Sequence, residues 1–252
     1  MDIVINKKIL DNIYINDFDS ETFKAIDPCG IVYKLMEHTS NQLDIELGAL
    51  FVSMISWGNR KAIRKAAEYM LCDEMKWSPS SFIIEGKFEN SYKNVKNNCV
   101  YRTLNVETFK SVCRKIRKGL DGYSTMEKCL AGKTAKESIS IICSWLSDAK
   151  IGTMEKSACK RICMFIRWMT RTTAPDFGIW STRNQQDLYA VMDVHVCDLT
   201  RSILTNKRPT WKACEELTNI FKSWDSDDPL KYDIALMVLA DKINKTNNKQ
   251  LN

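Results

Sequence analysis

Apolar residues recur every three or four positions along most of the chain, which is the spacing of an amphipathic α-helix. The strongest run lies within residues 44–56, and Gly58 marks its end because glycine is favoured just past a helix. Strand-like alternation is rare, so the pattern predicts an all-α fold of about ten helices. The clearest of these are expected over Asp44–Ser56, Arg60–Met75, Val106–Lys118, Lys136–Ser147, Ser157–Arg171, Val194–Leu204, Trp211–Trp224 and Pro229–Asn244.

Polar segments separate these helices. Pro79 with its neighbouring serines predicts a loop, and residues 86–105, rich in Asn and Lys, predict an irregular surface stretch. Pro175–Gly178 predicts a turn, and residues 245–252 predict a frayed polar tail. Because there is no internal repeat and no low-complexity linker, we expect residues 1–252 to form a single helical unit.

Composition narrows the class of protein. Hydrophobic residues make up 44% of the 252 residues, enough for a substantial core, which excludes disorder over the whole length. The net charge of +6 permits a polyanionic partner without requiring one. There is no apolar stretch approaching ~18 residues and no signal-peptide pattern, so we expect a cytoplasmic protein with no membrane partner. Ten cysteines in such a chain predict free thiols in a reducing compartment.

Metal and nucleotide motifs are absent. No C-x-x-C occurs, His38 and His195 are the only histidines, and no cysteine follows Cys214, so we expect neither structural zinc nor an iron–sulfur cluster. The tripeptide 132–134 resembles the end of a phosphate-binding loop, but Glu127 stands where that motif requires glycine. We therefore expect no metal and no cofactor.

Four cations gather at the start of one predicted helix, within Asn59–Lys65. Asn59 can cap this helix, and the free N–H groups of a capped N-terminus attract anions. The segment therefore predicts either a surface that follows phosphates or an ordinary solvated helix face.

A lysine in an apolar stretch is the second candidate. Lys160, Met164 and Arg167 share one helix face by three- and four-residue spacing. Burial would lower the pKa of this lysine and make it a nucleophile, although most such lysines extend to water instead.

An acid at a helix start is the third candidate. Asp193 lies between Met192 and Val194, where it can serve as a plain N-cap. A capping carboxylate that also faces a cleft would be a fixed anion, which suits electrostatic catalysis.

These residues carry a family resemblance. Met192–Val196 followed by Arg201 resembles the signature of helix-hairpin-helix DNA glycosylases, in which the aspartate is catalytic. The form of this box and its spacing from Lys160 are most similar to 8-oxoguanine DNA glycosylase/AP lyases of the archaeal type. Further motifs between Asp27 and Ala240 resemble a related bacterial family of formerly unknown function. These motifs are Ser56–Lys61, Ala158–Arg161, Phe165–Met169, Asp176–Trp180 and Asp228–Leu236.

The resemblance implies two helical subdomains around one cleft, with Lys160 as the nucleophile and Asp193 as its catalytic partner. It also implies that Asn59 inserts into the DNA stack as a polar wedge, while other side chains form the pocket of the everted base. The base-binding residues would be Asp233, Met237, Met164 and Trp57, and the DNA-binding residues Asn59, Arg60, Lys61, Arg161, His195 and Arg201.

The function implied is excision of an oxidised purine, 8-oxoguanine above all, from double-stranded DNA, with an associated lyase step. Asp233 could accept hydrogen bonds from the N–H groups of a guanine edge, and a monomer associated with the nucleoid is expected. Two alternatives stay open at this point: a helical DNA- or RNA-binding protein without catalysis, and a helical scaffold that binds another protein.

Overall fold

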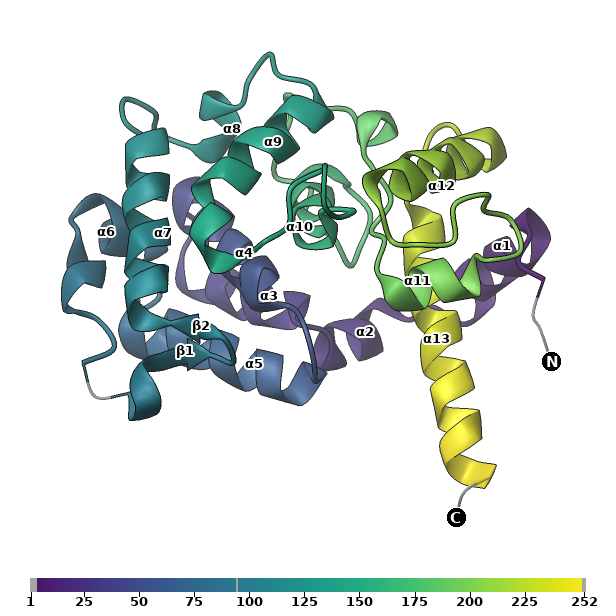
Figure 1. Cartoon of the computed structure of the whole chain (residues 1–252), viewed down its shortest axis with the longest axis horizontal. Helices are drawn as coiled ribbons and strands as arrows, with labels where there is room; N and C mark the ends of the chain where they lie inside the picture. The colour runs from purple at the N-terminus through teal and green to yellow at the C-terminus, as the bar shows by residue number, and fades with distance from the viewer. Residues whose placement is uncertain (1–3, 94, 251–252) are drawn as a thin grey trace.

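The computed structural model describes residues 4–93 and 95–250, and within them it shows thirteen α-helices and one two-stranded hairpin (Figure 1). The all-α prediction is therefore confirmed. The helices are α1 (Lys7–Asn16), α2 (Ser20–Ile26), α3 (Cys29–His38), α4 (Gln42–Ile55), α5 (Arg60–Glu68), α6 (Pro79–Ile84), α7 (Val106–Gly119), α8 (Met126–Cys129), α9 (Ala135–Trp145), α10 (Lys160–Thr170), α11 (Val194–Leu199), α12 (Trp211–Trp224) and α13 (Lys231–Gln250). The strands are β1 (Cys99–Tyr101) and β2 (Leu104–Asn105), the π-helix η1 is Tyr69–Glu74, and the 3₁₀ turns are η2 (Lys87–Asn90), η3 (Lys96–Asn98), η4 (Ser147–Ala149) and η5 (Gln185–Asp187).

Helix α4 is the centre of the core. Every residue from Leu43 to Ile55 is buried, as expected of a helix that is apolar on nearly all sides. Helices α3 and α10 pack against it. Lys160 is the first residue of α10, so the central packing fixes the helix that carries the predicted nucleophile.

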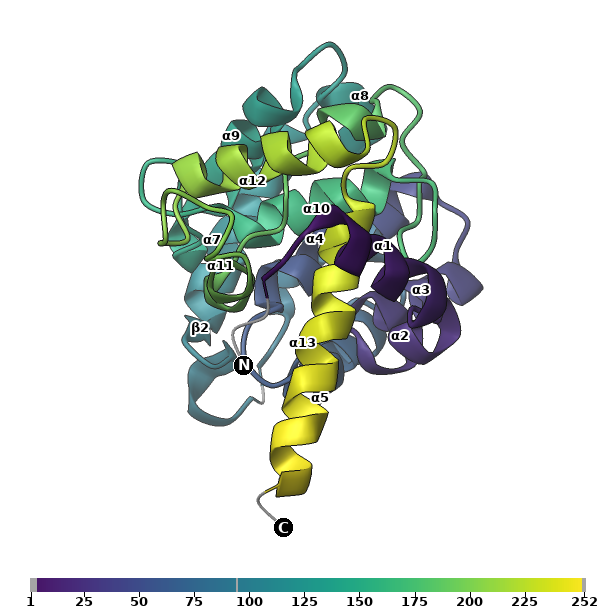
Figure 2. The same cartoon turned by 90° about the vertical axis from the view of Figure 1, so that its right-hand side faces the viewer.

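Helix α13 extends past the rest of the chain in both views (Figures 1 and 2). It packs against α1 and α11. The helix continues to Gln250, so the predicted end at Asn244 is wrong, because Lys and Gln favour helix and no glycine or proline interrupts the segment. Residues 251–252 of the predicted tail lie outside the described residues.

Several other predictions are corrected by the structure. Helices α1, α2 and α3 were not expected, and the helix predicted to end at Leu204 ends at Leu199. The predicted helix Arg60–Met75 forms almost to its end, as α5 followed directly by the π-helix η1 to Glu74. The stretch 86–105 is not merely an irregular surface, because it contains the β1–β2 hairpin and the buried side chains of Phe88, Tyr92 and Tyr101.

The ten cysteines are all free thiols, as predicted. Among the described residues, no helix is both long enough and apolar enough to cross a membrane.

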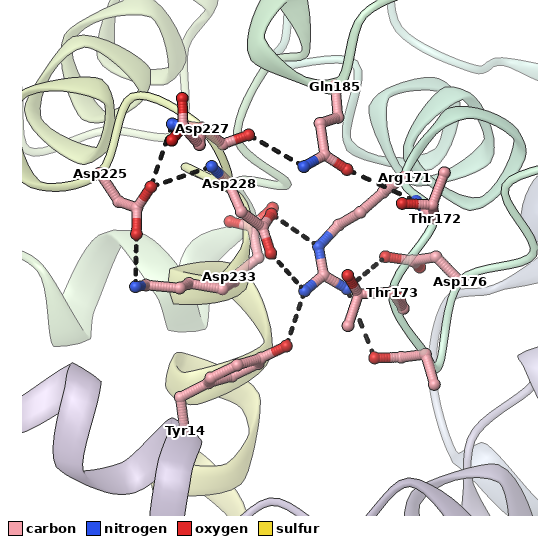
Figure 3. Close-up of polar contacts among 12 residues, drawn as sticks. Tyr14, Arg171, Thr172, Thr173, Asp176, Gln185, Asp225, Asp227, Asp228 and Asp233 are labelled. Atoms are coloured by element: carbon pink, nitrogen blue, oxygen red, sulfur yellow. Dashed lines mark hydrogen bonds and ion pairs between the residues drawn. The ribbon is translucent and has the colours of Figure 1, made fainter. Parts of the chain in front are cut away.

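A buried polar network ties the end of α10 to α13 and α1 (Figure 3). The fully buried Arg171 donates from Nε and Nη2 to the Asp228 carboxylate at 2.8 and 2.7 Å, and from Nη2 to Tyr14 Oη at 2.8 Å. Its Nη1 lies 3.2 Å from Asp176 Oδ2. The other Asp176 oxygen accepts from Arg167 Nε at 3.2 Å, so two arginines and their carboxylates form one continuous chain.

Replacing Arg171 is expected to destabilise the fold severely. In Arg171→Met the Asp228 carboxylate loses both bonds to its buried partner and Asp176 keeps only Arg167, which costs about 3–5 kcal/mol. The matched control is Arg114→Met, because Arg114 binds Glu89 through the same two-bond geometry at 2.6 Å but is 52% exposed. Exposed pairs contribute about 1 kcal/mol or less. Urea unfolding of both variants checks the difference, and equal losses would contradict the role given to burial.

Candidate active site

A cleft of about 1230 Å³ opens between segments that are far apart in the sequence. It is lined by the end of α2 and its link to α3, the turn Trp57–Asn59, α5, the first two turns of α10, α11 with its capping residue Asp193, and one face of α13. Four regions that carry predicted site residues, the turn with α5, α10, α11 and α13, therefore meet at one hollow.

Lys160 and Asp193 form an ion pair in this cleft. Lys160 Nζ lies 2.9 Å from Asp193 Oδ2, and the two side chains keep 35% and 29% of their exposure. Both residues line the cleft. The prediction that these two side chains lie together is thus confirmed by the geometry.

Asp193 is held in a fixed direction by its own helix. Its Oδ1 accepts the Val196 N–H at 2.9 Å, which confirms the predicted N-cap of α11. Burial alone would raise the pKa of Asp193, but the Lys160 ammonium and the Val196 N–H hold it below its usual range. Asp193 is therefore an oriented anion with one oxygen used for capping and the other turned to the lysine.

The predicted desolvation of Lys160 is incomplete in the free protein, since a third of its side chain remains exposed and a carboxylate faces it. Cys159, in the left-handed conformation with φ of 49°, precedes it and starts α10. A substrate that fills the cleft would be needed to exclude water from the amine.

Two methionines and a tryptophan supply the apolar lining. Met164, one turn after Lys160 on α10, is 8% exposed, and Met237 on α13 is half-buried. Both line the cleft together with Trp57. The structure thus brings the three predicted apolar base-binding residues into one hollow, and thioethers pack adaptably against flat rings.

Asp233 adds a buried carboxyl to the same cleft. It is 2% exposed, and its Oδ2 accepts the Val191 N–H at 3.0 Å and lies 3.6 Å from Arg167 Nη1. Its Oδ1 has no hydrogen-bond partner within the described part of the chain. Burial raises the pKa of Asp233 to about 6, although Arg167 and the Val191 N–H oppose the rise. The unpartnered oxygen is itself buried, so a polar ligand would reach it only after the side chains that cover it move.

The predicted DNA-binding residues fall into two groups. Asn59, Arg60, Lys61 and His195 line the cleft. Asn59 caps α5 by accepting the Ala62 N–H at 3.2 Å, and it is exposed together with Lys61 and His195. Arg60 differs, because its guanidinium lies 2.7 Å from Asp241 on α13 and its charge is largely balanced there.

Arg161 and Arg201 lie outside the residues that line the cleft. Arg161 is half-buried and donates to the Met54 carbonyl at 2.6 Å, and burial lowers its pKa. Arg201 is exposed and pairs with Asp198 at 2.9 Å. Neither arginine therefore contributes directly to the cleft in this structure.

Asp27 is a cleft residue that the sequence did not single out. It is 5% exposed, lines the cleft, and accepts the Cys29 N–H at 3.0 Å. Burial raises the pKa of its carboxyl. An aspartate before a proline, as at Pro28, is typical of an ordinary turn. No local sequence pattern indicates that this turn is buried against a cleft.

Fold and site together define an all-α protein with a lysine–aspartate pair in a large cleft. The chain belongs to the family described as "Protein of unknown function (DUF2400)", whose model matches residues 27–241. The matched range contains every cleft residue discussed above. No curated protein matches the chain, and no solved structure matches it.

Proposed function

We propose that the protein is a DNA glycosylase that excises an oxidised purine, with 8-oxoguanine as the preferred base, and that it then cleaves the strand as a lyase. The observation that carries the proposal is the 2.9 Å approach of Lys160 Nζ to Asp193 Oδ2 inside a cleft large enough for a nucleotide. An amine beside a fixed carboxylate is an arrangement suited to covalent attack on a sugar carbon.

The reaction assigns a separate role to each member of the pair. Lys160 loses a proton to solvent, and its Nζ bonds to C1′ as the bond from C1′ to the base breaks. The bonding electrons leave with the base, which then takes up a proton. Positive charge grows on the sugar during this step, and the Asp193 anion stabilises it.

The lyase step follows from the same adduct. The amine on C1′ expels the ring oxygen O4′ and gives a Schiff base. Loss of a proton from C2′ then breaks the bond from C3′ to its oxygen and releases the 3′ phosphate. This sequence needs no group beyond Lys160, water and the DNA.

The cleft also offers what an everted base requires. Eversion costs a few kcal/mol, which apolar contact with Met164 and Met237 and insertion of Asn59 in the vacated space would offset. The unpartnered Oδ1 of Asp233 is buried in the free protein, and it would accept an N–H of a guanine edge once the side chains that cover it move aside. These features favour a purine that carries donors on that edge.

The test is a nicking assay with an 8-oxoguanine duplex and the same duplex undamaged, followed by a panel of other oxidised bases. The proposal predicts a nick at the lesion alone. A non-catalytic DNA-binding protein would bind both duplexes and cut neither. The observations that favour this alternative are the exposed Lys61 and the capped N-terminus of α5.

Recognition of the lesion should depend on pH through Asp233. Because its pKa lies near 6, the carboxyl is neutral below that pH and becomes a stronger acceptor above it. The preference for lesion over undamaged duplex is expected to rise with pH through about 6, by up to ~10-fold for a hydrogen bond to a charged group. Binding is measured in a Lys160→Gln background, which prevents turnover.

The ratio of the two affinities cancels effects of pH that are common to both duplexes. In Asp233→Asn the ratio should be lower and independent of pH. A pH profile that survives this substitution would remove Asp233 from base recognition.

A further inference from the structure

The turn Trp57–Asn59 and the β1–β2 hairpin are joined at one edge of the cleft. Tyr101 Oη donates to the Trp57 carbonyl at 2.9 Å, and the Arg102 guanidinium lies 4.1 Å from the centre of the Trp57 ring system. Gly58, with φ of 101°, permits this approach, because a Cβ there would lie 2.2 Å from Arg102 Nη1. The turn and the hairpin therefore form one unit, which we call the paired tip.

Arg102 is a cation of the paired tip whose side chain has no polar partner within the described residues. It is exposed, its backbone is left-handed with φ of 51°, and within the described residues its side chain has neither a hydrogen bond nor a carboxylate partner. Nearby arginines differ, since Arg60 binds Asp241 and Arg161 binds a carbonyl. Stacking on an indole restricts the guanidinium while leaving its N–H edge available, so little freedom is lost when a ligand binds.

Further cations lie on both sides of Trp57. On the cleft side, α5 presents Lys61 and Lys65. On the hairpin side, a smaller hollow of about 200 Å³ is lined by Trp57, Thr103 and Lys150, among others. None of the three lysines pairs with a carboxylate within the described part of the chain, so the positive charge is available to a ligand that passes on both sides of Trp57.

We propose that the β1–β2 hairpin binds the second strand of duplex DNA, with Arg102 contacting a phosphate of the strand opposite the everted nucleotide. The inference rests on the proposed function, in which a nucleotide of the first strand enters the cleft. A duplex has two phosphate backbones. The cations on the cleft side of Trp57 would face the backbone of the first strand, and those on the hairpin side would face the backbone of the second strand. The planar guanidinium binds a phosphate through two parallel N–H bonds, which a lysine cannot reproduce.

The test compares duplex DNA containing a tetrahydrofuran abasic analogue with the same strand alone. In Arg102→Ala the duplex should bind about 10-fold more weakly, and the slope of log affinity against log salt should fall by about 0.9. Binding to the single strand should not change, and Arg102→Lys should recover part of the duplex affinity. The control is Lys133→Ala, in the loop between α8 and α9 at the opposite end of the molecule from the hairpin (Figures 1 and 2).

The outcomes separate this inference from the proposed function. Equal duplex affinity in Arg102→Ala and Lys133→Ala, or equal losses on duplex and single strand, would overturn the role of the hairpin. A loss that depends on which base faces the analogue would overturn the assignment to a phosphate. If wild-type protein shows the duplex-specific effect of Arg102 but excises no base, the hairpin inference stands and the glycosylase proposal fails.

Discussion

Lys160→Gln is expected to abolish strand cleavage and covalent trapping on DNA while leaving the affinity for duplex within about threefold. An amide cannot attack C1′ or form a Schiff base, so the excision rate should fall by about 10³-fold or more, as for loss of a catalytic nucleophile. Affinity is retained because the phosphate contacts assigned to α5 and the hairpin do not involve Lys160.

The structure also indicates that this variant will fold. Lys160 and Asp193 are both partly exposed, so water can solvate the carboxylate that remains. Lys156→Gln is the matched control, because Lys156 is an exposed lysine just before α10 and outside the cleft lining. Full activity in Lys160→Gln, or equal losses in both variants, would refute Lys160 as the nucleophile.

Asp193→Asn should lower the rate of base excision by about 10²–10³-fold, the size expected for removal of one electrostatic stabiliser of a transition state. Asparagine caps a helix as well as aspartate does, so the bond from the Val196 N–H and the position of α11 should be kept. The substitution therefore removes charge with little change in shape.

Single-turnover kinetics measure this effect, with affinity determined in parallel and expected to change by less than about threefold if the charge acts on the transition state. Asp187→Asn, an exposed carboxylate outside the cleft lining, is the control for a change in net charge. Wild-type rates of base excision in Asp193→Asn would show that the aspartate acts only as a helix cap and would refute its catalytic role.

Features that depend on neighbouring residues could be predicted from the sequence. The N-caps at Asn59 and Asp193 follow from a polar residue before an apolar run, and both form as expected. The shared face of Lys160, Met164 and Arg167 follows from helix geometry, and it places Arg167 against Asp233. That Lys160 meets Asp193 was predicted only through the family resemblance, because no local pattern joins residues 33 positions apart.

Features that depend on distant partners could not be predicted. Arg60 reads as a free cation, yet its partner Asp241 lies 181 residues later. The hairpin at Cys99–Asn105 was missed because Asn- and Lys-rich sequence is typical of loops, while burial of Tyr101 and the stack of Arg102 on Trp57 depend on the fold. Asp27 is similar, since its burial is created by helices that follow it.

Borohydride trapping on an 8-oxoguanine duplex, followed by mass mapping of the cross-linked peptide, tests the central claim most directly. A Schiff base between Lys160 and the sugar would be reduced to a stable adduct, so the account predicts one protein–DNA species with the modification at Lys160. Absence of any adduct across a panel of oxidised bases, or an adduct on a different lysine, would contradict it.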